Sequence, residues 1–148
     1  TEVAYNYRMT NMQAASGLGQ LEKIQWHLEE RQRIRRLYDK YLCDIQEYIT
    51  IQDIPAQATH TYWMYSIILN DNVKKSRDKI MANMEKRNIE MRPVFYPMHI
   101  MPPYFDANAS FPIAEYIGER GINLPTHSLL TEDHIKYIVN SLKDSIRD

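Results

Sequence analysis

Apolar residues recur at helical spacing in several stretches of the chain. The clearest covers residues 131–146, where apolar side chains return every three or four positions and so share one face of a helix. A longer pattern covers residues 10–42. Thr10 and Gln13, at its start, have the three-residue spacing of a helix-initiating capping box. Both stretches are therefore predicted to be helical.

Glycine and proline modify this pattern. Gly17 and Gly19 each cost about 1 kcal/mol relative to alanine inside a helix, so the first stretch can be one bent helix or two. They would also permit close packing of another backbone. Two shorter helices are predicted over residues 77–87 and 111–120, and Pro112 stands near the start of the latter, where a missing N–H is harmless.

Short runs rich in β-branched and aromatic residues lie between the helices. Residues 61–69 form the longest run, and residues 91–95 and 122–124 are shorter candidates. Residues 43–60 are expected to be irregular, and residues 96–110 are expected to form an ordered, extended loop. Four helices with about three short strands predict an α+β fold layered on one face of a sheet.

Composition narrows the classes of function. Hydrophobic residues make up 44% and charged residues 25%, and the net charge is -1, so a general nucleic-acid or membrane-surface binder is not expected. No apolar run approaches the roughly 20 residues of a membrane span.

Cys43 is the only cysteine, which excludes an intrachain disulfide and is compatible with a reducing cytoplasm. The five histidines lack the spacing of a helical metal motif, so no metal site is expected. Because the first residue is Thr1 rather than Met, we expect a longer parent chain or a processed end.

Two segments concentrate side chains that could bind a ligand. In the first, Tyr5, Asn6, Tyr7 and Arg8 precede the first helix; an amide can donate to a phosphate oxygen, and an arginine can hold a carboxylate or phosphate through two bonds. In the second, residues 92–99, two prolines accompany an arginine, a tyrosine and a histidine that could face a cleft. From the residues alone, a packing or capping role is favoured over a binding role for both segments.

A resemblance to a known family adds to this picture. Residues 5–22, with the pattern YNYRMTN-x-QAA-x-GL-x-QLE, resemble a stretch of the sugar aminotransferases of the DegT/DnrJ/EryC1/StrS family. Residues 92–104, RPVFYPMHIMPPY, resemble the later family loop with its P-x-H, and Leu124-Pro125 before a threonine-headed final helix matches the family's end. Within the family, the chain looks most like nucleotide-sugar 4-aminotransferases of the perosamine-synthase type.

The resemblance implies a fold-type I enzyme that depends on pyridoxal 5'-phosphate. In such enzymes a large α/β domain carries the cofactor, a small C-terminal domain covers it, and two subunits share each active site. Residues 22–148 would be the small domain, and residues 1–21 would belong to the interface with the large domain or the dimer partner. The implied reaction moves an amino group from an amino acid, commonly glutamate, to a nucleotide-linked keto sugar, and the implied partner is a second copy of the chain.

The resemblance also implies roles for the N-terminal segment. Asn6 matches the asparagine that reaches the cofactor phosphate of the other subunit. Arg8 matches a nearby arginine at the substrate entrance, and Tyr5 and Tyr7 would flank the same pocket. The family's catalytic lysine lies upstream of this segment, and none of the eight lysines present matches it. No catalytic residue is therefore expected in the chain, and the 148 residues alone are expected to be inactive.

In the later loop, Tyr96 and His99 match positions that face the sugar or nucleotide. His60 also falls at a family-like position, although a buried or capping histidine explains it equally well. Two alternatives stay open. One is a sugar dehydratase of the same family, in which a histidine replaces the upstream lysine. The other is a non-catalytic regulatory domain that has lost the catalytic half.

Overall fold

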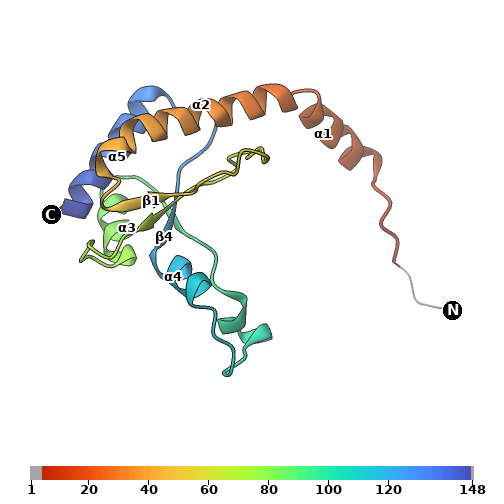
Figure 1. Ribbon diagram of the computed structural model, residues 1–148. Coiled ribbons are helices and arrows are strands. Elements are labelled where there is room, and N and C mark those ends of the chain that lie inside the picture. Colours follow the sequence, from red (N-terminus) through yellow and green to blue (C-terminus); the bar gives the residue numbers. More distant parts are fainter. Residues whose placement is uncertain (1–4, 148) are drawn as a thin grey trace.

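The computed structural model describes residues 5–147 and has an α+β fold. Figure 1 shows a small antiparallel sheet with helices packed around it and a long N-terminal arm. Within the described residues, the α-helices are α1 (Asn11–Leu21), α2 (Ile24–Leu42), α3 (Arg77–Glu85), α4 (Pro112–Arg120) and α5 (Glu132–Arg147). The strands are β1 (Ile49–Ile51), β2 (Tyr65–Leu69), β3 (Arg92–Pro93) and β4 (Gly121–Leu124).

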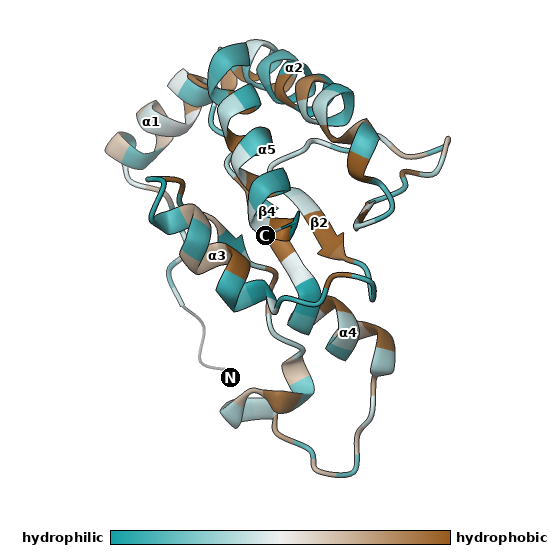
Figure 2. Ribbon diagram, turned by 90° about the vertical axis from the view of Figure 1, so that its left-hand side faces the viewer, coloured by the Kyte–Doolittle hydropathy of each residue, from teal (hydrophilic) through white to brown (hydrophobic). Residues whose placement is uncertain are grey.

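The four strands pair in the order β1-β2-β4-β3, and every neighbouring pair is antiparallel. Ile67 in β2 lies opposite Ile51 on one side and Ile122 on the other. Because successive side chains alternate between the two faces of a strand, Tyr65, Ile67 and Leu69 all face the core. Figure 2 shows hydrophobic residues concentrated in β2 and β4.

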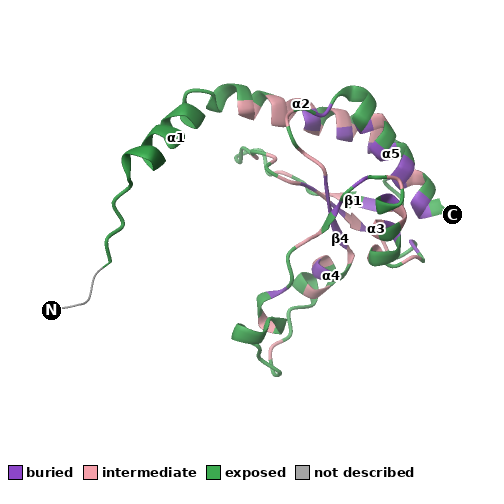
Figure 3. Cartoon of the chain, turned by 180° about the vertical axis from the view of Figure 1, so that it is seen from behind, coloured by how far each residue is buried: buried purple, intermediate pink, exposed green. Residues whose placement is uncertain are grey.

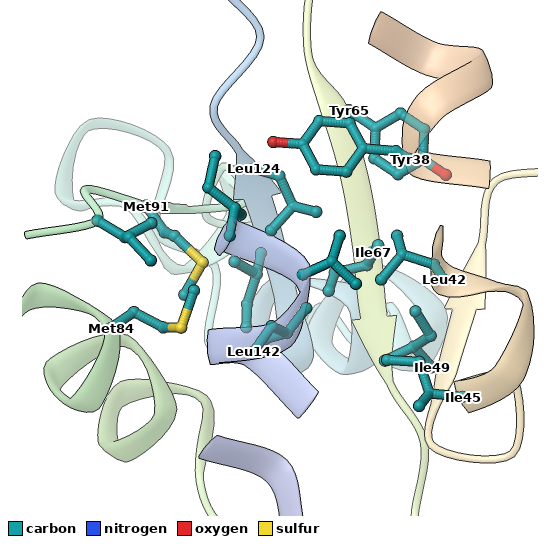
Figure 4. Packing of buried hydrophobic residues seen from close by; sticks show 14 of the residues in the cluster. Tyr38, Leu42, Ile45, Ile49, Tyr65, Ile67, Met84, Met91, Leu124 and Leu142 are labelled. Carbon is teal, nitrogen blue, oxygen red and sulfur yellow. The ribbon is translucent and has the colours of Figure 1, made fainter. Parts of the chain in front are cut away.

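The core fills the space between this face of the sheet and α2, α3 and α5. Figure 4 shows Tyr38 and Leu42 of α2 beside β2, whereas Met84 of α3 lies on the other side of the core, near Met91. The two buried tyrosine hydroxyls are satisfied, as buried polar groups require: Tyr38 donates to the carbonyl of Pro125 (2.8 Å), and Tyr65 donates to Oδ1 of Asp39 (2.6 Å).

The predicted fold class is confirmed. The stretch from Thr10 to Leu42 is two helices, one of the two arrangements expected for it, and the division lies at Glu22 and Lys23 rather than at the glycines. The sheet has four strands rather than about three, because β1 lies within residues 43–60, which were expected to be irregular. Three residues are too few to display an alternating pattern, so this strand is recognisable only by its pairing with β2.

Two predicted strands are shorter than expected. Residues 61–69 contribute only β2, because Tyr62 adopts a left-handed backbone (φ 50°) that interrupts an extended chain. Residues 91–95 contribute only the two residues of β3, which lies at the edge of the sheet, where Pro93 is tolerated.

The N-terminal arm, defined here as residues 5–21, packs differently from the rest of the chain. Every residue of the arm is exposed, including Met12 (82%) and Leu18 (57%), and Figure 3 shows α1 entirely in the colour of exposed residues. Gly17 and Gly19 have open space where a side chain would begin. Among the described helices, none is long and apolar enough to cross a membrane.

Candidate functional site

The four candidate residues of the arm precede a well-capped helix. Thr10 accepts a hydrogen bond from the backbone N–H of Gln13, and the Gln13 side chain accepts one from the backbone of Thr10. This reciprocal pair fixes the start of α1 and hence the direction in which the preceding residues leave it. Just before it, Asn6 Oδ1 accepts the backbone N–H of Arg8 (3.1 Å), a local turn that orients the amide side chain.

The chemistry of these residues suits an anion. Asn6 uses its oxygen in the turn, and within residues 5–147 its amide nitrogen donates to no acceptor. Arg8 forms no ion pair within the same residues, so its guanidinium also remains available. The exposed rings of Tyr5 and Tyr7 lie 6.2 Å apart between centroids and flank these donors. A phosphate group accepts hydrogen bonds from such N–H donors, so this donor set has the chemistry to bind a phosphate.

The second candidate group lies in the loop between β3 and α4, which projects below the sheet in Figure 1. His99 belongs to a short 3-10 helix (Met98–Ile100), and Tyr96 is 58% exposed just before it. The His99 side chain is only 11% exposed, and its Nε2 lies 3.0 Å from Oε1 of Glu115 in α4. Tyr96 is therefore free to meet a ligand, whereas His99 already has a protein partner on one side of its ring.

This loop is held closely against α4. A Cβ atom on Gly118 would lie 2.7 Å from Cδ of Pro97, and one on Gly121 would lie 2.5 Å from Cγ2 of Val94. Since real Cβ atoms do not approach so closely, both glycines are required by the packing. The loop is thus fixed to the helix at its start and at His99, although most of its large side chains are exposed.

The structure does not bring the two candidate groups together within one chain. In Figures 1 and 3, which view the molecule from opposite sides, the arm and the loop extend away from the sheet in different directions. His60 has a local role: its Nδ1 accepts the backbone N–H of Tyr62 (2.8 Å), and its ring lies 4.3 Å from the Tyr62 ring. That contact corresponds to the capping alternative for His60.

A pocket of about 750 Å³ lies elsewhere, beside β4 and the start of α5. None of the six candidate site residues lines it. Its polar lining residues include Arg92, Asn123, His127 and His134. Asn123 was missed by the sequence analysis, although a polar residue inside a short apolar strand is a recognisable signal; it accepts a hydrogen bond from Ser66 (2.6 Å). Across the described part of the chain, no cluster of three or more His, Cys, Asp or Glu residues could hold a metal ion.

Comparison with known proteins decides the family. The model of the DegT/DnrJ/EryC1/StrS aminotransferase family matches residues 1–143. The chain belongs to this family. Aminotransferases of the DegT/DnrJ/EryC1/StrS family depend on pyridoxal 5'-phosphate.

Relatives and solved structures refine this assignment. The GDP-perosamine synthase of Caulobacter vibrioides is 42% identical over 141 residues, which cover 95% of this chain and 38% of that protein. The Helicobacter pylori aminotransferase PseC, involved in pseudoaminic acid biosynthesis, has the same fold over 99% of this chain and 40% of its own (TM-score 0.88, 22% identity). An Escherichia coli GDP-4-keto-6-deoxy-D-mannose-3-dehydratase, solved with bound hydrated pyridoxal phosphate, also has this fold over 93% of this chain and 36% of its own (TM-score 0.80, 23% identity). The chain thus spans well under half the length of the proteins that it matches.

Proposed function

We propose that the chain is the C-terminal part of a pyridoxal-phosphate-dependent aminotransferase that aminates a nucleotide-linked keto sugar, with glutamate as the amino donor. The observation that carries the proposal is the 42% identity to a GDP-perosamine synthase over 95% of the chain. Products of such reactions are amino sugars for surface polysaccharides. The single cysteine is compatible with a reducing compartment, and we place the enzyme in the cytoplasm.

In this proposal the N-terminal arm serves the active site of a partner subunit. Pyridoxal phosphate, when bound, supplies the carbonyl group that takes up and delivers the amino group. Asn6 binds its phosphate across the dimer through the side-chain amide. Arg8 holds an anionic group at the substrate entrance, and Tyr5 and Tyr7 flank the pocket. Their exposure supports this role, because side chains that act on another subunit must be free of their own domain.

The loop before α4 serves the sugar nucleotide in the same proposal. Tyr96 presents an exposed ring and hydroxyl, and His99 presents the side of its ring that Glu115 leaves free. Polar groups fixed on a rigid support orient a substrate better than mobile ones, and the close packing of Pro97 on Gly118 supplies that support.

We further propose a homodimer in which α1 is covered. Met12, Leu18 and Leu21 are between 57% and 82% exposed, and Tyr7 and Met9 continue the apolar surface toward the N-terminus. Several large apolar side chains exposed side by side on one segment are typical of an interface. The large domain of the enzyme, or a second copy of the chain, would cover it.

The dehydratase alternative stays open, because the fold is common to an aminotransferase and a dehydratase. The position that separates the two reactions lies upstream of the family motif found here. The sequence identity to a GDP-perosamine synthase favours transamination. A non-catalytic regulatory role is the weaker alternative, because the arm retains the donor residues that such a domain would not need.

A chimera tests the proposal. The whole of this chain would replace the matching region of the Caulobacter GDP-perosamine synthase, and formation of GDP-perosamine from glutamate and the corresponding keto sugar nucleotide would be measured. We expect an active enzyme that retains its cofactor. We expect the 148 residues alone to show no transamination, because in the chimera the catalytic lysine comes from the Caulobacter part of the sequence.

Asn6→Ala in the chimera should weaken cofactor retention by about 1.5–3 kcal/mol, the range for a hydrogen bond to a charged group. Asn72→Ala is the matched control, because Asn72 is exposed in a turn far from the arm. A chimera that folds and holds the cofactor but makes no amino sugar would contradict the proposed reaction. Equal cofactor affinity in both variants would remove Asn6 from the phosphate site.

A further inference from the structure

Glu115 joins helix α4 to the loop that carries His99. It lies in the first turn of α4, and its Oε1 accepts two hydrogen bonds from the preceding loop. One comes from the backbone N–H of Phe111 (2.9 Å), and the other joins Nε2 of His99 (3.0 Å). A single carboxylate oxygen therefore ties both ends of the segment between residues 99 and 111 to the helix.

The bond to Glu115 decides which nitrogen of His99 carries hydrogen. An ionised carboxylate only accepts hydrogen bonds, so Nε2 must be the donor. In the neutral ring, Nδ1 then holds the lone pair and is an acceptor. Nδ1 has no partner among residues 5–147, and within these residues no unpaired side-chain nitrogen or oxygen is buried. Nδ1 is therefore not fully buried.

Other contacts keep the ring in this orientation. The Phe111 ring lies against it with 5.1 Å between centroids, and the His99 carbonyl accepts the backbone N–H of Asp106 (3.1 Å). Pro97, two residues earlier, is packed on Gly118. The imidazole is consequently held on one edge and open on the other.

We propose that Glu115 is a positioning residue that holds His99 in the Nε2–H form, so that Nδ1 is presented outward as an acceptor for a sugar hydroxyl. The role of Glu115 follows from the geometry of this chain alone. The choice of a sugar hydroxyl as ligand rests on the proposed function.

The tautomer can be measured by nitrogen NMR of the histidine rings in the 148-residue chain, at a pH above the titration range of an ordinary histidine. The variant His99→Gln identifies the His99 signals. We expect a protonated Nε2 and an unprotonated Nδ1 in the wild type and in Glu115→Gln, whose amide oxygen can still accept both hydrogen bonds. Glu115→Ala should shift the tautomer ratio toward that of a free neutral imidazole, with a measurable share of the Nδ1–H form. Glu119→Ala is the matched control, because Glu119 is an exposed carboxylate one turn further along α4.

A wild-type ring protonated on Nδ1, or an unchanged tautomer in Glu115→Ala, would overturn the proposal. The ligand is tested in the chimera: Glu115→Ala should raise the KM for the keto sugar nucleotide at least tenfold, with the KM restored in Glu115→Gln and unaffected in Glu119→Ala. An unchanged KM in Glu115→Ala would overturn the sugar-hydroxyl assignment. A chimera inactive in every form would count against the proposed function, and the NMR result would still decide the role of Glu115.

Discussion

Helices α1 and α5 both begin at a threonine whose hydroxyl accepts a backbone hydrogen bond from three residues further along. In α1, Thr10 pairs with Gln13, and in α5, Thr131 pairs reciprocally with His134. Their surroundings are opposite: α1 has no buried residue, whereas seven residues of α5 are buried. The same local capping signal therefore starts both helices, but it does not determine whether a helix is buried.

The difference lies in how apolar residues are distributed and what they meet. In α5 they form one stripe that packs on α2, α3 and the sheet. In α1, Met12, Leu18 and Leu21 stay exposed, because this helix extends away from the domain and does not pack on it. Tertiary packing supplies most of the stability of a protein helix, so α1 has only its cap and its propensity within this chain.

Among the variants that test the difference between α1 and α5, Leu142→Ala should change the free energy of unfolding most. Leu142 is fully buried at the centre of α5, and its truncation should lower the free energy of unfolding by about 2–5 kcal/mol through lost burial and a cavity. Leu18→Ala, the same change in α1, should alter the free energy of unfolding of the monomeric chain by no more than about 0.5 kcal/mol. Denaturant unfolding measures both. Equal losses would mean that α1 is packed in solution.

Tyr65→Phe tests a polar contact of the core. It removes the hydrogen bond to Asp39, whose carboxylate is one-third exposed, so we expect a loss of about 1.5 kcal/mol, at the low end for charged partners. Tyr7→Phe in the exposed arm is the control and should change nothing measurable. An equal effect of both variants on denaturant unfolding would show that the hydroxyl of Tyr65 contributes nothing.

The same tyrosines predict an alkaline limit to stability. Burial raises the pKa of Tyr38 above its ordinary value of 10.0. The pKa of Tyr65 is also raised above 10.0, mainly by burial and secondly by the hydrogen bond to Asp39. A raised pKa in the folded state means that the stabilisation is complete below the unfolded value and is lost as the pH rises above it. The free energy of unfolding should therefore fall above about pH 10, by about 1.4 kcal/mol per pH unit for each tyrosine. Unfolding measured across this range should show a shallower decline in Tyr65→Phe; an identical decline would exclude Tyr65 as a cause.

Thr10→Ala should act on α1 alone. Loss of an N-cap costs a helix about 0.5–2 kcal/mol, so amide hydrogens of residues 11–16 should exchange faster. Global unfolding should be unaffected, because α1 contributes no buried residue to the core. Hydrogen exchange followed residue by residue separates the local effect from the global one. A lowered global stability would contradict the prediction, because it would mean that α1 contributes to the stability of the core.

Met12→Lys should have the smallest effect on folding. Met12 is 82% exposed, so the free energy of unfolding should stay within about 0.5 kcal/mol of the wild type. Under the proposed dimer, the added charge should instead shift the chain toward the monomer in sedimentation. Self-association that is unchanged by Met12→Lys would place the interface elsewhere.

Sequence patterns were sufficient where local and tertiary preferences agree. The stripe of residues 131–146 predicts α5 because each apolar position in it also meets the core. The strand β1 was missed because Ile49–Ile51 exists only through its pairing with β2. The candidate site shows the same contrast. The sequence displays the residue types at Asn6 and His99 directly. Glu115, which orients His99, lies 16 positions further along the chain, and no local pattern connects the two.

The sequence by itself determined the family, the α+β class, the helix caps and the side chains with the chemistry to bind a phosphate or a sugar. Each of these depends on residue type and short-range spacing, which the chain displays directly. Only the tertiary structure decided that the arm is unburied while α5 is enclosed, that the loop is clamped on Gly118 and Gly121, and that Glu115 fixes the orientation of His99. Those outcomes depend on contacts between residues distant in sequence, and such contacts arise only when the packed core brings their elements together.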